Sequence, residues 1–454
     1  MSQNHTIITR FPPSPTGPLH IGNVRTALFN YLFARQNNGK FVVRVEDTDK
    51  ARSKKEYEEN MLNGLTWLGF SRDGELWHQS ERTEIYKSYL QKLIESGKAY
   101  ISQESEGENK EVVRFKNPNT TITFTDLIRG TVSFDTTELG DFIIARNINE
   151  PIYHLAVVID DFETGVTHII RGEDHVSNTP RQILIQEAIG APRPVYAHLP
   201  LILAKDRSKL SKRKHGESVS LDYYRAKGYL PNALVNYMAL LGWNPGTEQE
   251  IFTLDELIKL FDISKIQKGG AIFDEEKLKW IDSEHRKKLQ DEEILNLISK
   301  NIIADQNLSN KYGAVFADKA NSLKLLSVSG MRNYTFAEQK DVLESGYLDF
   351  SIKTPSYQKE SLLWKDEKDF GNSLRHIQWV IEAISKIDSS SWNAEVIKSV
   401  IWEYATENGR GNVLWPMRMA LSGKEKSPDP FVISEIIGKD ETLTRLKEAE
   451  KLLQ

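Results

Sequence analysis

The chain has 454 residues and a formal net charge of −5, with 39% hydrophobic and 27% charged residues, a composition that predicts about three domains with ordinary globular cores. Because cysteine is absent, disulfides, thiolate zinc sites and a cysteine nucleophile are excluded, and the negative net charge argues against binding nucleic acid through bulk electrostatics. No apolar run is long enough to span a membrane and no export signal is visible, so we expect a cytoplasmic protein without a membrane partner.

The first 45 residues predict a strand, a helix and a second strand. Thr6 to Phe11 and Phe41 to Val45 are β-rich runs, and Val24 to Ala34 carries apolar residues at helical spacing. This order predicts a parallel βαβ unit. The prolines of the sequence PPSPTGP make the loop before the helix rigid, which places His20 near the N-terminus of that helix.

A second unit of the same kind is predicted further along the chain. Thr167 to Arg171 is expected to form a strand, Asn178 to Ala188 a helix, and Val195 to Leu203 another strand. The two units enclose an insertion from about Ser80 to Asp161.

The insertion is expected to be a mixed domain. Its polar stretch Ser102 to Lys110 predicts an exposed turn, and Val112 to Phe115 and Thr131 to Phe134 predict strands.

Beyond Gly216 the pattern becomes helical. Amphipathic spacing predicts helices at Pro231 to Leu241, Leu254 to Phe261 and Glu275 to Ile281. Two apolar stripes predict further helices, and they consist of Leu374, Ile377, Ile381 and Ile384, and of Val396, Val400, Ile401 and Tyr404. The predicted fold class is therefore α/β, with a Rossmann-type parallel sheet, a mixed insert domain and all-α C-terminal domains.

Two short loops carry the chemistry of a divided ATP site. The first, PSPTGPLHIGN, leads into a helix, where His20, Gly22 and Asn23 offer backbone N–H groups, a close approach and an imidazole donor to a phosphate. The second, KLSKR, offers ammonium groups at Lys209 and Lys212 around a small hydroxyl at Ser211. Neither a Walker loop nor a GxGxxG motif is present. Lys212 is the principal catalytic candidate, through charge stabilisation.

The chain resembles bacterial glutamyl-tRNA synthetases, which are class I aminoacyl-tRNA synthetases. RFPPSPTGPLHIGN resembles the HIGH region of that family, VRVEDTDKAR its second strand and KLSKR its KMSKS loop. IIRGEDHVSNTPRQ, GYLPNALVNYMALLGW and VLWPMRMALSG resemble further family segments in the same order, so the resemblance covers nearly the whole chain.

The resemblance implies a glutamate–tRNA ligase that activates L-glutamate with ATP to an adenylate, releases pyrophosphate and transfers the glutamyl group to the 3′ end of tRNA(Glu). No protein nucleophile is needed, because the substrate carboxylate attacks the α-phosphate. ATP is expected to bring Mg²⁺, and no zinc or other protein-bound metal is expected. The protein is expected to act as a monomer.

The family pattern assigns roles to residues of this chain. It implies catalytic roles for His20, Lys209 and Lys212. ATP is expected to contact His20, Gly22, Asn23, Asp174, Ile202, Lys209, Ser211 and Lys212. Glutamate is expected to contact Arg10, Pro12, Ser14, Glu46, Tyr153, Val157 and Arg171, of which the two arginines suit carboxylates and Glu46 suits the α-ammonium.

The same resemblance predicts five segments. These are residues 1–79 and 162–215 as the two halves of the catalytic domain, 80–161 as the insert that serves the acceptor end, 216–300 as a helical stem-contact domain, and 301–454 as an all-helical anticodon-binding domain.

Three features depart from the family or invite another interpretation. Val157 is apolar where relatives often offer a polar side chain. The insert is short, with only about a dozen residues between Tyr100 and Arg114, where many relatives carry a longer subdomain with zinc-binding cysteines. The acidic pairs Asp47 with Asp49 and Asp160 with Asp161 are interpreted as capping and solvated residues rather than a metal site.

Two alternatives stay open. Glutaminyl-tRNA synthetase is the nearest rival, but its first loop typically has P-E-P-N where this chain has PSPT, and its C-terminal part is β-rich. A non-catalytic tRNA-binding paralogue would be expected to lose one of the two loops, and both are present. The helical C-terminal third also argues against the shorter glutamyl-queuosine tRNA(Asp) synthetase.

Overall fold

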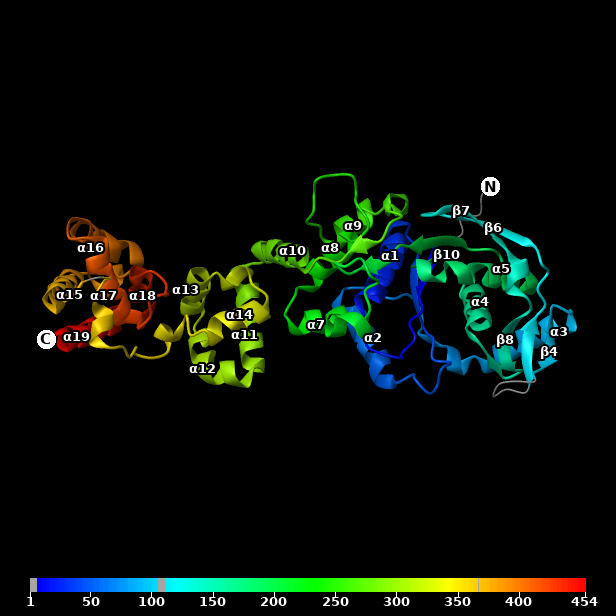
Figure 1. Ribbon diagram of the computed structural model, residues 1–454, viewed down its shortest axis with the longest axis horizontal. Coiled ribbons are helices and arrows are strands. Elements are labelled where there is room, and N and C mark those ends of the chain that lie inside the picture. The colour runs from blue at the N-terminus through cyan, green and yellow to red at the C-terminus, as the bar shows by residue number, and fades with distance from the viewer. Residues whose placement is uncertain (1–5, 105–110, 366) are drawn as a thin grey trace. The chain divides into compact units, whose positions relative to one another are not determined.

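The computed structural model of the chain contains two compact units, one ending at His285 and the other formed by Arg286–Gln454. It describes residues 6–104, 111–365 and 367–454. The first unit contains the strands and the second is helical. Figure 1 shows the chain coloured from blue at the N-terminus to red at the C-terminus. Each unit is therefore built around cores of its own.

The first unit begins with the predicted βαβ arrangement, which the structure confirms. Strands β1 (Ile8–Phe11), β2 (Lys40–Val45) and β3 (Trp77–His78) are parallel neighbours in that order. Helix α1 (Ile21–Gln36) connects β1 to β2, and α2 (Lys55–Trp67) follows. Helix α1 is buried along almost its whole length because it packs against strands and helices of the same core.

The second sheet contains more of the insert than the sequence indicated. Strands β10 (His168–Gly172) and β11 (Val195–Leu199) are parallel, with helix α5 (Thr179–Ile189) between them in the chain. The sheet order is β10-β11-β6-β7, so the hairpin of β6 (Thr121–Asp126) and β7 (Gly130–Asp135) extends this sheet. The two sheets meet where the Thr167 N–H donates to the Ile8 carbonyl (3.0 Å).

The rest of the insert forms a separate antiparallel sheet. Its order is β4 (Ala99–Gln103), β5 (Glu111–Phe115), β8 (Phe142–Asn147) and β9 (Glu150–Pro151). Helices α3 (Thr83–Glu95) and α4 (Tyr153–Glu163) share a core with it. Of the predicted exposed turn, residues 105–110 lie outside the described residues.

The prediction of a single strand from Val195 to Leu203 is wrong. Strand β11 ends at Leu199, and β12 (Ile202–Leu203) pairs instead with β13 (Ala271–Ile272). Pro200 separates them, and proline has no N–H with which to continue a sheet ladder.

The KLSKR loop runs into the short helix α6 (Lys212–His215). The helices that follow it share the core of the first unit, and they are α7 (Leu221–Ala226), α8 (Pro231–Leu240), α9 (Leu254–Leu260) and α10 (Glu275–Lys288). Buried residues of α8 and α9 belong to the same apolar cluster as α1. The first compact unit therefore continues through most of the segment predicted as the stem-contact domain.

The second unit is a set of packed helices with its own apolar core. The helices are α11 (Asp291–Ala304), α12 (Gln306–Ala317), α13 (Lys319–Ser329), α14 (Phe336–Glu344), α15 (Phe370–Ser385), α16 (Ala394–Glu407), α17 (Arg410–Ser422), α18 (Pro430–Ile437) and α19 (Lys439–Leu453). The two predicted apolar stripes lie on α15 and α16 and face this core, which confirms the all-α prediction.

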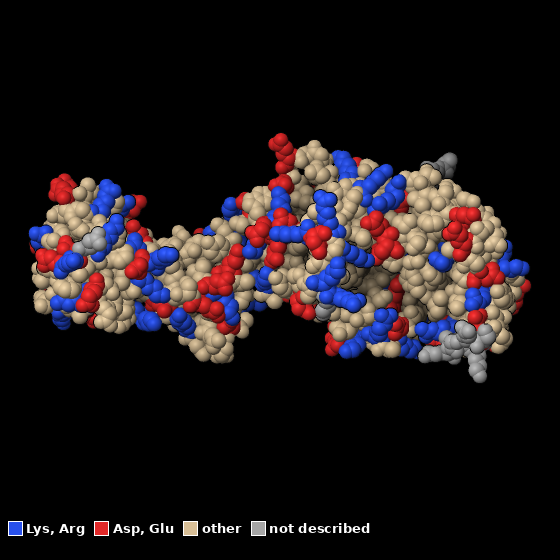
Figure 2. Space-filling model, in the orientation of Figure 1, with Lys and Arg blue, Asp and Glu red and all other residues tan. Residues whose placement is uncertain are grey.

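Figure 2 shows charge of both signs on the face of the first unit that it draws, where Lys and Arg side chains are interspersed with Asp and Glu. Within the described parts of the chain, no helix is both long and apolar enough to cross a membrane.

Candidate active site

The first predicted phosphate-binding loop ends in a histidine cap on helix α1. His20 Nδ1 accepts hydrogen bonds from the N–H groups of Gly22 (3.1 Å) and Asn23 (3.3 Å). These backbone groups therefore bind His20, whereas the sequence suggested a phosphate. A Cβ at Gly22 would lie 3.0 Å from the imidazole, so glycine makes room for the cap. Because Nδ1 accepts, the neutral ring carries its hydrogen on Nε2, which can donate to an anion.

The second loop begins as a tight hairpin with β12. The Leu210 N–H donates to the Ile202 carbonyl (3.0 Å), and the Ala204 N–H donates to the Ser208 carbonyl (2.9 Å). Arg207 takes the left-handed conformation that closes the turn, with φ 63°. Ile202, predicted near adenine, is thus a buried anchor of the hairpin.

The hairpin leads into α6. The Ser211 carbonyl accepts hydrogen bonds from the N–H groups of Lys214 (3.2 Å) and His215 (3.0 Å), so the loop ends in one helical turn. The backbone of Lys212 opens this helix, while its side chain lies outside what the structure describes.

The structure brings both loops together at one place. Lys209 Nζ donates to Asp174 Oδ2 (2.9 Å). Partial desolvation and then the charge of Lys209 lower the pKa of His20, and the Asp174 carboxylate opposes them, so all three groups lie within electrostatic reach. Burial raises the pKa of Asp174, but the Lys209 hydrogen bond and the charge of His175 outweigh it and the pKa lies below its usual value.

Four predicted glutamate-binding groups converge in a second, adjoining place. Arg10 on β1, Glu46 at the end of β2 and Arg171 on β10 are 2%, 8% and 5% exposed. Burial, followed by the charge of Glu46, raises the pKa of Tyr153, while Arg171 and Arg10 lower it. The Glu46 N–H donates to the Pro13 carbonyl (2.9 Å), which joins this cluster to the first loop.

The remaining predicted glutamate contacts differ in burial. Pro12 is half-buried and Ser14 is exposed. Val157 is buried on α4, four residues after Tyr153 and therefore on the same helical face. Its apolar side chain cannot donate a hydrogen bond to a substrate.

A buried ionic network joins two members of this cluster, Arg10 and Glu46, and the sequence did not predict it. Asp161 accepts from Arg44 Nη1 (2.8 Å) and Arg10 Nε (3.3 Å), and Arg44 Nη2 donates to Glu46 (3.1 Å). Burial raises the pKa of Asp161, but the two arginines outweigh burial and the pKa lies below its usual value. Burial raises the pKa of Glu46, and Arg44 offsets only part of that rise.

Asp160 belongs to the same network. It accepts hydrogen bonds from Gln79 Nε2, Arg82 Nε and Tyr86 Oη, each 2.8 Å away. The interpretation of Asp160 and Asp161 as capping and solvated residues is therefore wrong, because both are at most 4% exposed and ion-paired. Only their sequence context, the buried apolar run of α4, could have indicated this.

Asp47 and Asp49 behave as expected. Asp47 accepts from the Ser80 N–H (2.8 Å), and Asp49 accepts from the exposed Arg52 (2.6 Å). In the described portion of the chain, no cluster of three or more His, Cys, Asp or Glu residues could hold a metal ion.

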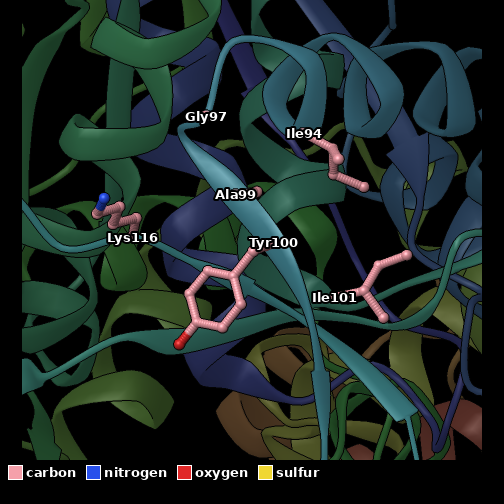
Figure 3. Close-up of a pocket in the computed structure, with 6 residues that line it drawn as sticks. All are labelled: Ile94, Gly97, Ala99, Tyr100, Ile101 and Lys116. Atoms are coloured by element: carbon pink, nitrogen blue, oxygen red, sulfur yellow. The ribbon is translucent and has the colours of Figure 1, made fainter.

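The insert carries a separate hollow of about 560 Å³. Ile94, Gly97, Ala99, Tyr100, Ile101 and Lys116 line it (Figure 3). Tyr100 and Ile101, on the edge strand β4, are 39% and 50% exposed. None of these residues belongs to the two clusters described above.

Comparison with known proteins shows the family of the chain. A family model described as "tRNA synthetases class I (E and Q), catalytic domain" matches residues 6–108 and 101–280, and one described as "Anticodon binding domain" matches residues 334–450. Glutamate–tRNA ligases of Carboxydothermus hydrogenoformans and Aquifex aeolicus are 40% and 39% identical, over 96% and 98% of this chain and 98% and 99% of theirs.

A solved structure extends the comparison to the fold. A glutamate tRNA ligase from Elizabethkingia meningosepticum, crystallised in complex with its amino acid, matches with a TM-score of 0.85 and 32% identity. The match covers 99% of this chain and all of the other. Since the family models and full-length relatives match the chain that carries both loops and the pocket, the chain belongs to the class I tRNA synthetases for glutamate and glutamine, within the glutamate–tRNA ligase family.

Proposed function

We propose that the chain joins L-glutamate to tRNA(Glu) in two steps. In the first, a glutamate carboxylate oxygen attacks the α-phosphate of ATP, the bond to the β-phosphate breaks, and glutamyl-adenylate and pyrophosphate form. In the second, the 2′-hydroxyl of the terminal adenosine attacks the adenylate carbonyl, and AMP leaves. The main support is the juxtaposition of two buried guanidiniums and one buried carboxylate beside the His20, Lys209 and Asp174 cluster.

The amino-acid pocket matches a substrate with two carboxylates and one ammonium. Arg10 and Arg171 offer positive, planar donors that suit carboxylates. Glu46 offers the only anionic group assigned to the substrate, and it would take the α-ammonium. Tyr153 and Ser14 add hydroxyl contacts. This set favours glutamate over glutamine, because a neutral amide would leave a buried guanidinium without its partner charge.

The nucleotide cluster would act by charge and position. His20 Nε2–H and the ammonium of Lys209 would contact the phosphates, and Asp174 would contact the ribose. Lys212 would stabilise the charge that develops as pyrophosphate leaves. Gly22, Asn23 and Ser211 shape the two loops, and Ile202 contributes backbone near adenine. Mg²⁺ would arrive with ATP, and we propose no zinc.

The remaining segments would position tRNA. We propose that residues 80–161 meet the acceptor end, that 216–300 contact the stem, and that 301–454 read the anticodon. We also propose that the protein works as a monomer in the cytoplasm.

Exchange of labelled pyrophosphate into ATP tests the first step. Glutamate and tRNA(Glu) together are expected to support exchange, because family members require tRNA for activation. Absence of exchange under these conditions would favour a non-catalytic tRNA-binding paralogue over an active ligase. Charging of purified tRNA(Glu) and tRNA(Gln) side by side, with glutamate and with glutamine, separates the glutamyl reading from the glutaminyl one.

A further inference from the structure

Arg171 is held on three sides by buried polar groups. Its Nη1 donates to Gln182 Oε1 (2.7 Å), its Nε donates to His198 Nε2 (3.2 Å), and its Nη2 donates to Thr179 Oγ1 (2.9 Å) and to the His175 carbonyl (3.5 Å). Gln182, Thr179 and His198 are each at most 1% exposed. The guanidinium therefore cannot turn without breaking buried hydrogen bonds, which are costly to leave unmade.

The contact with His198 requires one ring tautomer. Arginine carries only donors, so His198 Nε2 must present its lone pair to Arg171 Nε–H. The Thr179 hydroxyl lies 3.2 Å from the same nitrogen and can also donate to it. In a neutral imidazole the hydrogen is then on Nδ1. Whether Nε2 is free to accept from Arg171 is thus decided by the group that binds Nδ1.

Asp126 binds that other nitrogen. His198 Nδ1 lies 2.6 Å from Asp126 Oδ2. The second oxygen, Asp126 Oδ1, accepts from the N–H groups of Ile128 (2.9 Å) and Arg129 (2.8 Å), so the carboxylate has a fixed orientation. Asp126 is 2% exposed and His198 is fully buried. A carboxylate is acceptor-only, so it selects the tautomer that Arg171 needs.

This chain of contacts reaches Arg171 from the insert. Asp126 ends strand β6, which pairs with β11 opposite Tyr196, while His198 lies two residues further along β11. We propose that Asp126 and His198 are positioning residues for glutamate recognition, because together they fix the direction in which Arg171 presents its guanidinium to the substrate carboxylate. The inference rests on the proposed role of Arg171 in binding glutamate and adds a residue of the insert to the amino-acid pocket.

Asp126→Asn tests the tautomer directly. The two backbone N–H groups at Oδ1 require an oxygen there, so the new amide nitrogen takes the position of Oδ2 and donates to His198 Nδ1. The ring hydrogen then moves to Nε2, where it faces the Arg171 donor. By analogy with residues that orient metal ligands from outside, we expect the KM for glutamate in pyrophosphate exchange to rise about 10- to 100-fold. The KM for ATP is expected to change less than about twofold, since only the amino-acid pocket is affected.

His198→Gln supplies the decisive comparison. A glutamine oxygen can accept from Arg171 Nε without any tautomer, so this variant is expected to stay within about fivefold of the wild type. Asp126→Asn combined with His198→Gln is expected to resemble His198→Gln alone, that is, the second change suppresses the first. The proposal would be overturned if the KM for glutamate of the double variant rose as much as that of Asp126→Asn, or by the product of the two single effects. If Asp126 had only a structural role, glutamine at position 198 would not relieve its loss.

Controls separate misfolding and failure of the proposed function. Asp135→Asn is the matched control, since the exposed Asp135 caps a turn of the same hairpin through the Thr137 N–H (3.0 Å). If Asp126→Asn fails a thermal-unfolding check, His198→Leu replaces it, and a glutamate KM equal to that of His198→Gln would overturn the proposal. Wild-type protein without exchange would refute the proposed function, whereas active wild type with an unchanged Asp126→Asn variant would refute this inference alone.

Discussion

Lys209 reaches across 35 positions of the chain to donate to Asp174 at 2.9 Å. Both side chains are about half exposed, at 55% and 48%, so the pair adds little to stability, about 1 kcal/mol or less. Such a weak pair can be exchanged for a phosphate at small cost. If the loop binds ATP as proposed, this contact would hold Lys209 near the site without fixing it there.

Asp174→Asn is expected to raise the KM for ATP several-fold, because Asp174 is proposed to contact the ribose. The melting temperature should stay within about 2 °C of the wild type, because the pair with Lys209 is half exposed. ATP titrations in pyrophosphate exchange measure the first quantity and calorimetry the second. Asp206→Asn is the control, because Asp206 caps Ser208 in the same hairpin without touching Lys209. Equal effects of the two substitutions would remove Asp174 from the nucleotide site.

Lys212→Ala is expected to lower kcat by roughly 10²- to 10³-fold, since it removes one charge contact made in the transition state. The affinity for glutamate should remain nearly unchanged. Steady-state exchange kinetics give both values. A loss confined to glutamate affinity would assign Lys212 to the amino-acid pocket instead.

Arg171→Ala is expected to raise the KM for glutamate far more than the KM for ATP, because the buried guanidinium would serve substrate binding. Glutamate and ATP titrations of the same preparation compare the two. Arg181→Ala is a suitable control from the neighbouring helix α5. Within the described residues, the Arg181 side chain donates a hydrogen bond only to the Ser177 carbonyl. Similar shifts for both substrates would count against the assignment of Arg171.

Asp161→Asn is expected to lower the free energy of unfolding by about 3–5 kcal/mol, since it leaves two buried guanidiniums short of their shared carboxylate. Urea unfolding of the first unit measures this. Asp49→Asn, which alters an exposed pair, should cost less than about 1 kcal/mol. If both variants unfold at the same urea concentration, the buried network is not holding the pocket.

Stability should also depend on pH through two histidines. Burial, reinforced by nearby arginines, lowers the pKa of His154 and of His175 to about 4. Above pH 6.5 both rings are neutral in the folded and in the unfolded chain, so they do not lower the free energy of unfolding there. Between pH 6.5 and about 4 only the unfolded chain binds these protons, so the free energy of unfolding falls as pH falls. Urea unfolding at pH 7.5 and 5 checks this, and His154→Gln should show a smaller difference between the two.

The sequence predicted the elements with strong local patterns. The βαβ unit, the helices after Gly216 and the two loops all follow from periodicity and turn chemistry within short windows. The strand ending at Leu199 was predicted too long, because the apolar run continues through Pro200 while the backbone changes partner from β10 to β13.

The pocket was harder to predict where its partners are distant in the chain. Asp126 and His198 are 72 positions apart, and each alone is an unremarkable polar residue in a strand. Asp161 belongs to an acidic pair that resembles a solvated turn. In the structure it contacts Arg10 and Arg44, which are 151 and 117 positions away in the chain. Such contacts come from sheet order, which local pattern does not reveal.

The β6–β7 hairpin changes which parts of this chain can be exchanged with a relative. Because β6 pairs with β11 and carries Asp126, a graft that replaces residues 80–161 as one block also replaces a support of Arg171. A graft limited to the connection between β4 and β5 leaves that support in place. Hybrid synthetases built on this scaffold should therefore keep their amino-acid preference when only the connection between β4 and β5 is exchanged, and are expected to lose it when the exchanged block includes Asp126.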